Sequence, residues 1–174
     1  ETPYMINPAG FTIHSAVHAA AEDHHVVMQV HTDDGVAVSA QKDGLLPLSQ
    51  TAMLARADLS YHDYEGVALD HDERERIVAD LGDTHAMILR NHGTLTVGAT
   101  AAECFLRMFF LERACSMQVR ALTAGRDGVL HGTEEVQEVV RGQSNPQGMS
   151  TLANMLAWPG LLRKLDRERP GYDM

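Results

Sequence analysis

Helical segments alternate with short apolar runs along this chain, and that alternation limits it to folds built around a sheet. The runs at 26–31, 86–89 and 94–98 are apolar and include β-branched residues, as strands do. The first run is continuous enough to predict a strand buried on both faces. A charged amphipathic helix is expected at 72–81 and a longer, mostly apolar one at 101–122. These features predict an α/β domain.

Shorter elements complete the pattern. Helices are also expected near 11–21, 36–40, 50–56 and 152–165, and a short strand at 59–61 precedes a polar turn at 62–66. Glycines and polar residues prevail between 125 and 147, which indicates a linker around one short helix. A length of 174 residues suits a single domain, so we expect a domain over 1–125 and a C-terminal helical tail over 126–174.

Charge and hydropathy exclude several classes of function. The formal net charge is −10 and no run of Lys and Arg occurs, which argues against nucleic acid as a partner. No apolar stretch is long enough to cross a membrane, and the first residues lack the pattern of a signal peptide. We therefore expect a soluble, cytoplasmic protein. The chain begins like the middle of a domain, so an N-terminal part of that domain is expected to be absent.

Two of the ten histidines stand directly where predicted strands end. His31 closes the run at 26–31, and Gln29 lies two residues earlier, on the same face of that strand. His92 follows the run at 86–89, in a tight turn that can reach the same end of the sheet. Gln29, His31 and His92 can therefore converge on a metal ion, because histidine is a common metal ligand.

The other histidines favour structural readings. His14 and His18 are four residues apart on one helix and can share a metal, but packing under the sheet is the preferred interpretation. His24 and His25 follow a helix end, and His62 lies in the polar turn, where it can contact a substrate. Surface positions are expected for His71, His85 and His131. Cys104 and Cys115 are about three helical turns apart, too far for a disulfide, and are expected to be reduced core residues.

Five motifs in order resemble the class II aldolase/adducin family, adducin-like branch, over the first three quarters of the chain. The matching segments are Asn7-Pro8-Ala9-Gly10-Phe11-Thr12-Ile13-His14-Ser15-Ala16, residues 31–40, Leu45-Leu46-Pro47-Leu48-Ser49, Tyr61-His62-Asp63-Tyr64-Glu65-Gly66 and Leu89-Arg90-Asn91-His92-Gly93. The resemblance implies an α/β fold, an αβα sandwich with a largely antiparallel central sheet, that assembles as a homotetramer with sites between subunits. It also implies a divalent metal, commonly zinc, held by a His-x-His pair and a later histidine, and stabilising an enediolate.

The sequence departs from that pattern at two positions. Gln29 replaces the first histidine of the pair, which weakens zinc binding or favours manganese or magnesium over zinc. Gly10 stands where the aldolases have a glutamate that acts as acid or base, and the adducin-like branch shares the Asn-Pro-Ala-Gly found here. The resemblance implies that the family's phosphate-binding segment precedes the residues of this chain.

Three residues are candidates to replace the missing proton-transfer group. Asp33 lies two residues after His31, and Tyr64 and Glu65 lie in the polar turn. The competing readings are a helix cap for Asp33 and a solvated turn residue for Glu65.

The resemblance implies a metal-dependent lyase or isomerase acting on a small hydroxy-carbonyl substrate, a class that includes sugar phosphates. The alternatives are a non-catalytic adducin-like assembly module, which Gly10 and Gln29 favour, and a metal-dependent decarboxylase on the same fold. Phe105, Met108, Phe109, Phe110 and Met117 are expected to form core or subunit interface. Trp158 marks a tail that can fold over a neighbouring subunit.

Overall fold

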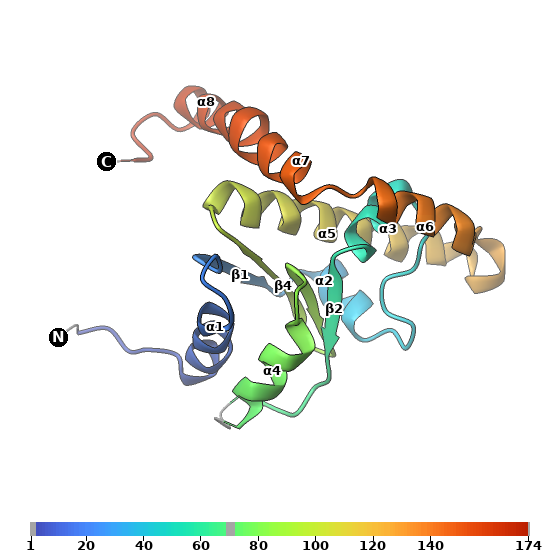
Figure 1. The fold of residues 1–174 in the computed structure, drawn as a ribbon, viewed down its shortest axis with the longest axis horizontal. Coiled ribbons are helices and arrows are strands. Elements are labelled where there is room, and N and C mark those ends of the chain that lie inside the picture. The colour runs from blue at the N-terminus through green and yellow to red at the C-terminus, as the bar shows by residue number, and fades with distance from the viewer. Residues whose placement is uncertain (1–2, 69–71, 174) are drawn as a thin grey trace.

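A four-stranded sheet forms the centre of the molecule (Figure 1). The computed structural model describes residues 3–68 and 72–173. In the order β1-β4-β3-β2, the strands are β1 (Val26–Val30), β4 (Gly93–Gly98), β3 (Ala86–Leu89) and β2 (Leu59–His62). β4 pairs antiparallel with both β1 and β3, whereas β2 runs parallel to β3. The sheet is therefore largely antiparallel, as predicted.

Helices flank the sheet and continue beyond it. They are α1 (Pro8–Ala20), α2 (Asp33–Ser39), α3 (Gln50–Arg56), α4 (Glu73–Leu81), α5 (Ala101–Ala121), α6 (Glu134–Gln143), α7 (Pro146–Thr151) and α8 (Trp158–Glu168). Two short 3-10 turns, η1 (Leu122–Ala124) and η2 (Arg126–Gly128), follow α5, and the π-helical turn η3 (Leu152–Ala157) joins α7 to α8. Within residues 3–68 and 72–173, no helix combines the length and apolarity needed to cross a bilayer.

Each face of the sheet is covered by helices, and a separate apolar core lies on each side. On one face α1 and α4 pack against β3 and β4, with Val17, Ile77 and Leu95 fully buried. On the other face α2, α3 and α5 cover the sheet around Ile88 and Leu111. Burial of this apolar surface is the main force that holds the layers together. The predicted αβα sandwich is confirmed.

Polar side chains fix where the helices begin. Asn7, Thr32, Ser49 and Thr100 each precede a helix and accept a hydrogen bond from a backbone N–H of its first turn. Thr32 is thus the N-cap of α2, and Asp33 is the first helical residue. Thr32 and Thr100 cap the helices that follow β1 and β4.

The prediction that the first strand is buried on both faces is wrong. All five residues of β1 are only half-buried, because β1 is an edge strand with β4 as its single neighbour. An apolar run without strict alternation does not distinguish an edge strand from a central one when helices cover both faces. His31 directly follows β1 and is exposed.

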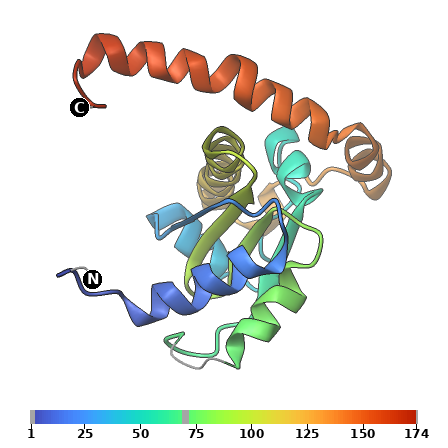
Figure 2. The same ribbon diagram turned by 60° about the vertical axis from the view of Figure 1, so that its left-hand side comes forward.

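The C-terminal helix starts earlier than predicted and crosses α5 on the side away from the sheet (Figure 2). It begins at Pro146 rather than at Leu152, because the Asn145 side chain caps it by accepting from the N–H of Gln147. Ala153 packs against Ala102 and Leu106 of α5 in a small third core. Beyond that contact no residue of α8 is buried. The separation of a domain at 1–125 from a tail at 126–174 stays a prediction.

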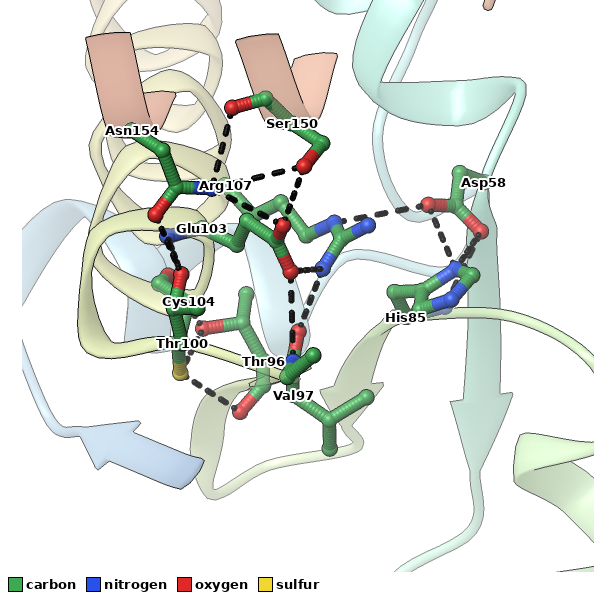
Figure 3. A network of polar contacts seen from close by, with 11 residues as sticks. Asp58, His85, Thr96, Val97, Thr100, Glu103, Cys104, Arg107, Ser150 and Asn154 are labelled. Carbon is green, nitrogen blue, oxygen red and sulfur yellow. Dashed lines mark hydrogen bonds and ion pairs between the residues drawn. The ribbon is translucent and has the colours of Figure 1, made fainter. Parts of the chain in front are cut away.

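A buried carboxylate joins this helix to α5 (Figure 3). One oxygen of Glu103 accepts from the Ser150 hydroxyl at 2.5 Å and the Asn154 amide at 3.0 Å. The other accepts from the Ala99 N–H and lies 4.0 Å from the Arg107 guanidinium. Burial acts to raise the pKa of Glu103, but these donors outweigh it and leave the pKa below its ordinary value. The contact is therefore that of a charged carboxylate.

Candidate functional site

The two histidines lie at one end of the strands, where β1 and β3 end and β4 begins. His31 follows the last residue of β1, and Val30 pairs with Thr94 of β4. His92 lies in the turn that joins β3 to β4 and directly precedes Gly93. A side chain at position 93 would bring its Cβ within 2.4 Å of the Val30 carbonyl oxygen. Glycine is required there because the two histidine-bearing segments approach so closely.

Gln29, His31 and His92 converge on one point. The Gln29 amide nitrogen lies 3.1 Å from Nε2 of His92 and 3.3 Å from Nε2 of His31. The two imidazole rings are stacked, with centroids 4.8 Å apart and an angle of 17° between their planes. Both Nε2 atoms therefore face the same amide group, as the strand alternation predicts for Gln29 and His31.

The surroundings of His92 favour its neutral form. Its side chain is half-buried, and this burial, with a smaller contribution from His31, lowers its pKa below the ordinary value. A neutral imidazole offers an unprotonated nitrogen, which is the form that binds a metal. The Gln29 NH₂ group can donate to that unprotonated nitrogen, whereas the amide oxygen can serve as a ligand for a cation.

The donor set suits a divalent cation, but it lacks an anionic ligand. In the part of the chain that the structure describes, no three His, Cys, Asp or Glu side chains are grouped as metal ligands would be. Gln29 supplies the third donor instead, and an amide neutralises no charge. Gly10 lies in the first turn of α1 and has no side chain to add a carboxylate. Two imidazoles and one neutral oxygen can hold a cation more weakly than three imidazoles.

The three candidate proton-transfer residues occupy different surroundings. Asp33 is exposed in the first turn of α2. Tyr64 is 53% exposed and lines a small cavity that His92 and Arg90 also line. Both oxygens of Glu65 accept from Arg76, at 2.7 and 2.5 Å, and this interaction lowers the pKa of Glu65. Tyr64 is thus the candidate that the structure brings near His92, and the catalytic roles of all three stay predictions.

An open groove of about 540 Å³ adjoins the same end of the strands. It is lined by Lys42, Tyr64 and Arg90, and by Asn91, which has a positive φ of 55° in the turn before His92. The Arg90 guanidinium stacks over the Tyr61 ring at 4.3 Å and donates to the carbonyl of Gln41. The groove therefore presents two cationic side chains, Lys42 and Arg90, and one carboxylate, Asp63, next to the turn that carries His92.

Three of the remaining histidines make local hydrogen bonds. His18 bonds the carbonyl of His24, and His24 is buried and bonds the carbonyl of Val17. His85 bonds Asp58. His131 is exposed, and His71 lies outside the described residues.

The expectation that His62 lies in the polar turn is wrong. His62 is the last residue of β2 and only 4% exposed, with Nδ1 2.7 Å from Asp80 and Nε2 3.4 Å from Glu73. Glu73, in the charged first turn of α4, is buried, and the sequence did not lead us to expect it as a partner of His62. Its spacing of four and eight residues from Ile77 and Leu81, both buried, places it on the inner face of the helix and is the signal that could have found it.

Comparison with known proteins identifies the family of this chain. The family profile "Class II Aldolase and Adducin N-terminal domain" matches residues 1–119. An unconfirmed aldolase class 2 protein of Caulobacter vibrioides is 65% identical over 172 residues, which is 99% of this chain and 66% of that protein. The chain therefore spans just under two thirds of that relative's length.

Two solved structures share the fold. An aldolase II superfamily protein from Pseudomonas syringae has a TM-score of 0.87 and 45% identity, over 97% of this chain and 67% of that one. The L-fuculose 1-phosphate aldolase of Glaciozyma antarctica has a TM-score of 0.75 and 25% identity, over 94% of this chain and 61% of that one. The chain belongs to the class II aldolase and adducin N-terminal domain family.

Proposed function

We propose that this chain carries the metal site of a lyase or isomerase of the class II aldolase type, acting on a small hydroxy-carbonyl compound. The observation that carries the proposal is the position of the Gln29 amide nitrogen, which lies within 3.3 Å of Nε2 of both His31 and His92. The similarity to an L-fuculose 1-phosphate aldolase supports a hydroxylated, phosphorylated substrate class. Zinc is the expected cation, and manganese or magnesium are the alternatives that the Gln29 amide favours.

The chain's own residues hold and orient the reacting groups. A bound divalent cation would stabilise the negative charge of an enediolate oxygen. His31 and His92 supply neutral nitrogen ligands, and Gly93 keeps their segments close. Tyr64 is the candidate for proton transfer because it lines the cavity next to His92. Lys42 and Arg90 in the adjoining groove fit an anionic substituent on the substrate.

Metal analysis tests this proposal. We expect the purified protein to contain one divalent ion per chain and to lose it in His92→Ala. His25→Ala is the matched control, because His25 is an exposed histidine at the other end of β1 and should leave the metal content unchanged. Absence of stoichiometric metal in the native protein, after growth with added zinc and manganese, would overturn the proposal. Screening hydroxy-carbonyl compounds and their phosphates for cleavage or epimerisation then identifies the reaction.

An assembly module is the second candidate, and the position of the Gln29 amide favours it. That amide lies between both imidazoles and bonds each of them, so the cluster is satisfied without a cation. In this case the chain should form a homo-oligomer, expected to be a tetramer, without turnover. Light scattering of His31→Ala decides between the two candidates. If His31→Ala stays oligomeric but loses its metal, the result supports an enzyme site. If His31→Ala dissociates and the native protein shows no measurable turnover, the result supports a scaffold.

A further inference from the structure

We infer that Glu112 is a positioning residue that fixes the two histidine-bearing segments relative to each other. Glu112 lies on α5, on the face that packs against α2 and β4. One of its oxygens accepts from the Thr32 hydroxyl and the other from the Thr94 hydroxyl, at 2.5 Å for Thr94. Thr32 directly follows His31, and Thr94 is two residues after His92. A single carboxylate thus joins the two segments that carry the site.

The contact of Glu112 with Thr32 acts on the exit of β1. Thr32 is the N-cap of α2, and its hydroxyl oxygen accepts from the N–H of Gly35 at 3.0 Å while its proton is donated to Glu112. The cap fixes the backbone directly after His31. Gly35 leaves the space that the carboxylate occupies, since a Cβ there would lie 2.7 Å from a Glu112 oxygen. The path from His31 into α2 is therefore built around the carboxylate.

The contact with Thr94 acts on the start of β4. Thr94 is fully buried, and besides Glu112 its hydroxyl has the Met108 sulfur at 3.5 Å, a weak acceptor, within reach. A carboxylate accepts from both hydroxyls at once, and a buried hydroxyl that loses its acceptor is costly. Docking of α2 on α5 does not itself require Glu112, because Ser116 donates to Asp34 one turn further along the same two helices.

The consequence for the site rests on the proposed function, in which the His31 and His92 rings bind a cation. Their stacking at 4.8 Å depends on the relative position of the two segments. Groups that orient metal ligands without touching the metal commonly contribute about 10- to 100-fold to metal affinity. Glu112 acts through Thr32 and Thr94, so we expect an effect near the lower end, about tenfold.

The experiment compares Glu112→Gln with Ser116→Ala in the same 174-residue chain. Gln keeps the size of the side chain, but its amide has one oxygen and one NH₂ group. It therefore cannot accept from the Thr32 and Thr94 hydroxyls with a separate oxygen for each, as the carboxylate does. Titration with Co²⁺ alone measures affinity, and the imidazole ring resonances of His31 and His92 in the metal-free protein measure ring position. We expect about tenfold weaker Co²⁺ binding and shifted or broadened ring resonances for Glu112→Gln, and neither change for Ser116→Ala.

Thr94→Val and Thr94→Ser supply a second test that does not alter Glu112, and they replace Glu112→Gln if that variant fails to fold. Thr94→Val should reproduce both effects, and Thr94→Ser, which keeps the hydroxyl, should restore native values. Unchanged Co²⁺ affinity and ring resonances in Glu112→Gln and Thr94→Val overturn the inference and leave the proposed function standing. If the native chain binds no Co²⁺, the proposed function fails instead, and the metal-free ring resonances alone decide the role of Glu112.

Discussion

Gln29 is the residue on which cation affinity depends in the proposed metal site, because it offers a neutral amide rather than an imidazole. Its side chain already points between His31 and His92, so a histidine at this position should complete a set of three nitrogen ligands. We expect Gln29→His to bind zinc at least about tenfold more tightly than the native chain. Competition against a chromophoric chelator measures this change. The matched variant Gln29→Leu should bind more weakly than the native chain, and equal affinity for all three would show that position 29 is not a ligand.

Cys115 provides a second prediction at the scale of one residue. Its thiol is fully buried, and burial raises its pKa to about 12, with Glu112 and Asp34 adding to the effect. The thiolate is the reactive form, so at pH 8 only about one Cys115 side chain in ten thousand is reactive in the folded protein. Alkylation followed by mass spectrometry should find Cys115 unmodified in buffer and modified in urea. Equal labelling in both conditions would contradict the buried position. Cys104, also buried and with a raised pKa, should behave in the same way.

At the scale of whole elements, the strand ends could be predicted from the sequence and their surroundings could not. His31 and His92 were predictable because each follows a short apolar run, and strand alternation then gave Gln29. Glu112 was not, because its contact with Thr32 joins residues 80 positions apart, and no local pattern distinguishes it from a solvated helical glutamate. The edge position of β1 depends on strand order, which periodicity does not determine.

The C-terminal helix is a second case in which the element could be predicted and its surroundings could not. The apolar spacing after Leu152 predicts a helix, but the first turn at Pro146 is polar and depends on the Asn145 cap. Its attachment to α5 through Glu103 depends on Ser150 and Asn154. Both residues are polar, so the periodicity of apolar residues does not indicate them. The helix was therefore predictable and its polar anchor was not.

That anchor supports a prediction at the element scale. Asn154 donates to Glu103 at 3.0 Å and accepts from the Thr100 hydroxyl at 2.9 Å. Asn154→Leu removes both bonds and should lower the free energy of unfolding by about 1.5–3 kcal/mol, as expected for a hydrogen bond to a charged group. Urea unfolding followed by circular dichroism measures this loss. The control Met155→Ala alters the next residue, which is 70% exposed, and should stay within about 0.5 kcal/mol of the native protein. Equal stability of the two variants would rule out an anchoring role for Asn154.

For the whole molecule, the shifted pKa values predict how stability depends on pH. In the metal-free protein, burial is the main cause that lowers the pKa of His14 and of His92 below the ordinary value of 6.5, so the unfolded chain binds more protons than the folded one as the pH falls through 6.5. Glu103 has a pKa below 4.5, so its stabilisation is lost in stronger acid. Cys104 and Cys115 have pKa values above 9.0, so the unfolded chain loses their protons first in alkali. Stability should therefore be greatest between about pH 7 and pH 9 and fall on both sides.

On the acid side the net charge has the opposite effect on stability, so its contribution must be separated from that of the shifted groups. At pH 7 the formal net charge is −10, and acid reduces the repulsion among these charges as the pH approaches the pI near 5.3. Urea midpoints at pH 5, 6, 8 and 10, measured at high ionic strength to screen that repulsion, isolate the contribution of the shifted groups. His14→Gln should reduce the loss of stability between pH 8 and pH 5, whereas His25→Gln, at an exposed histidine, should leave it unchanged. A midpoint at pH 5 as high as at pH 8 would show that burial of these histidines contributes nothing to the acid sensitivity of the fold.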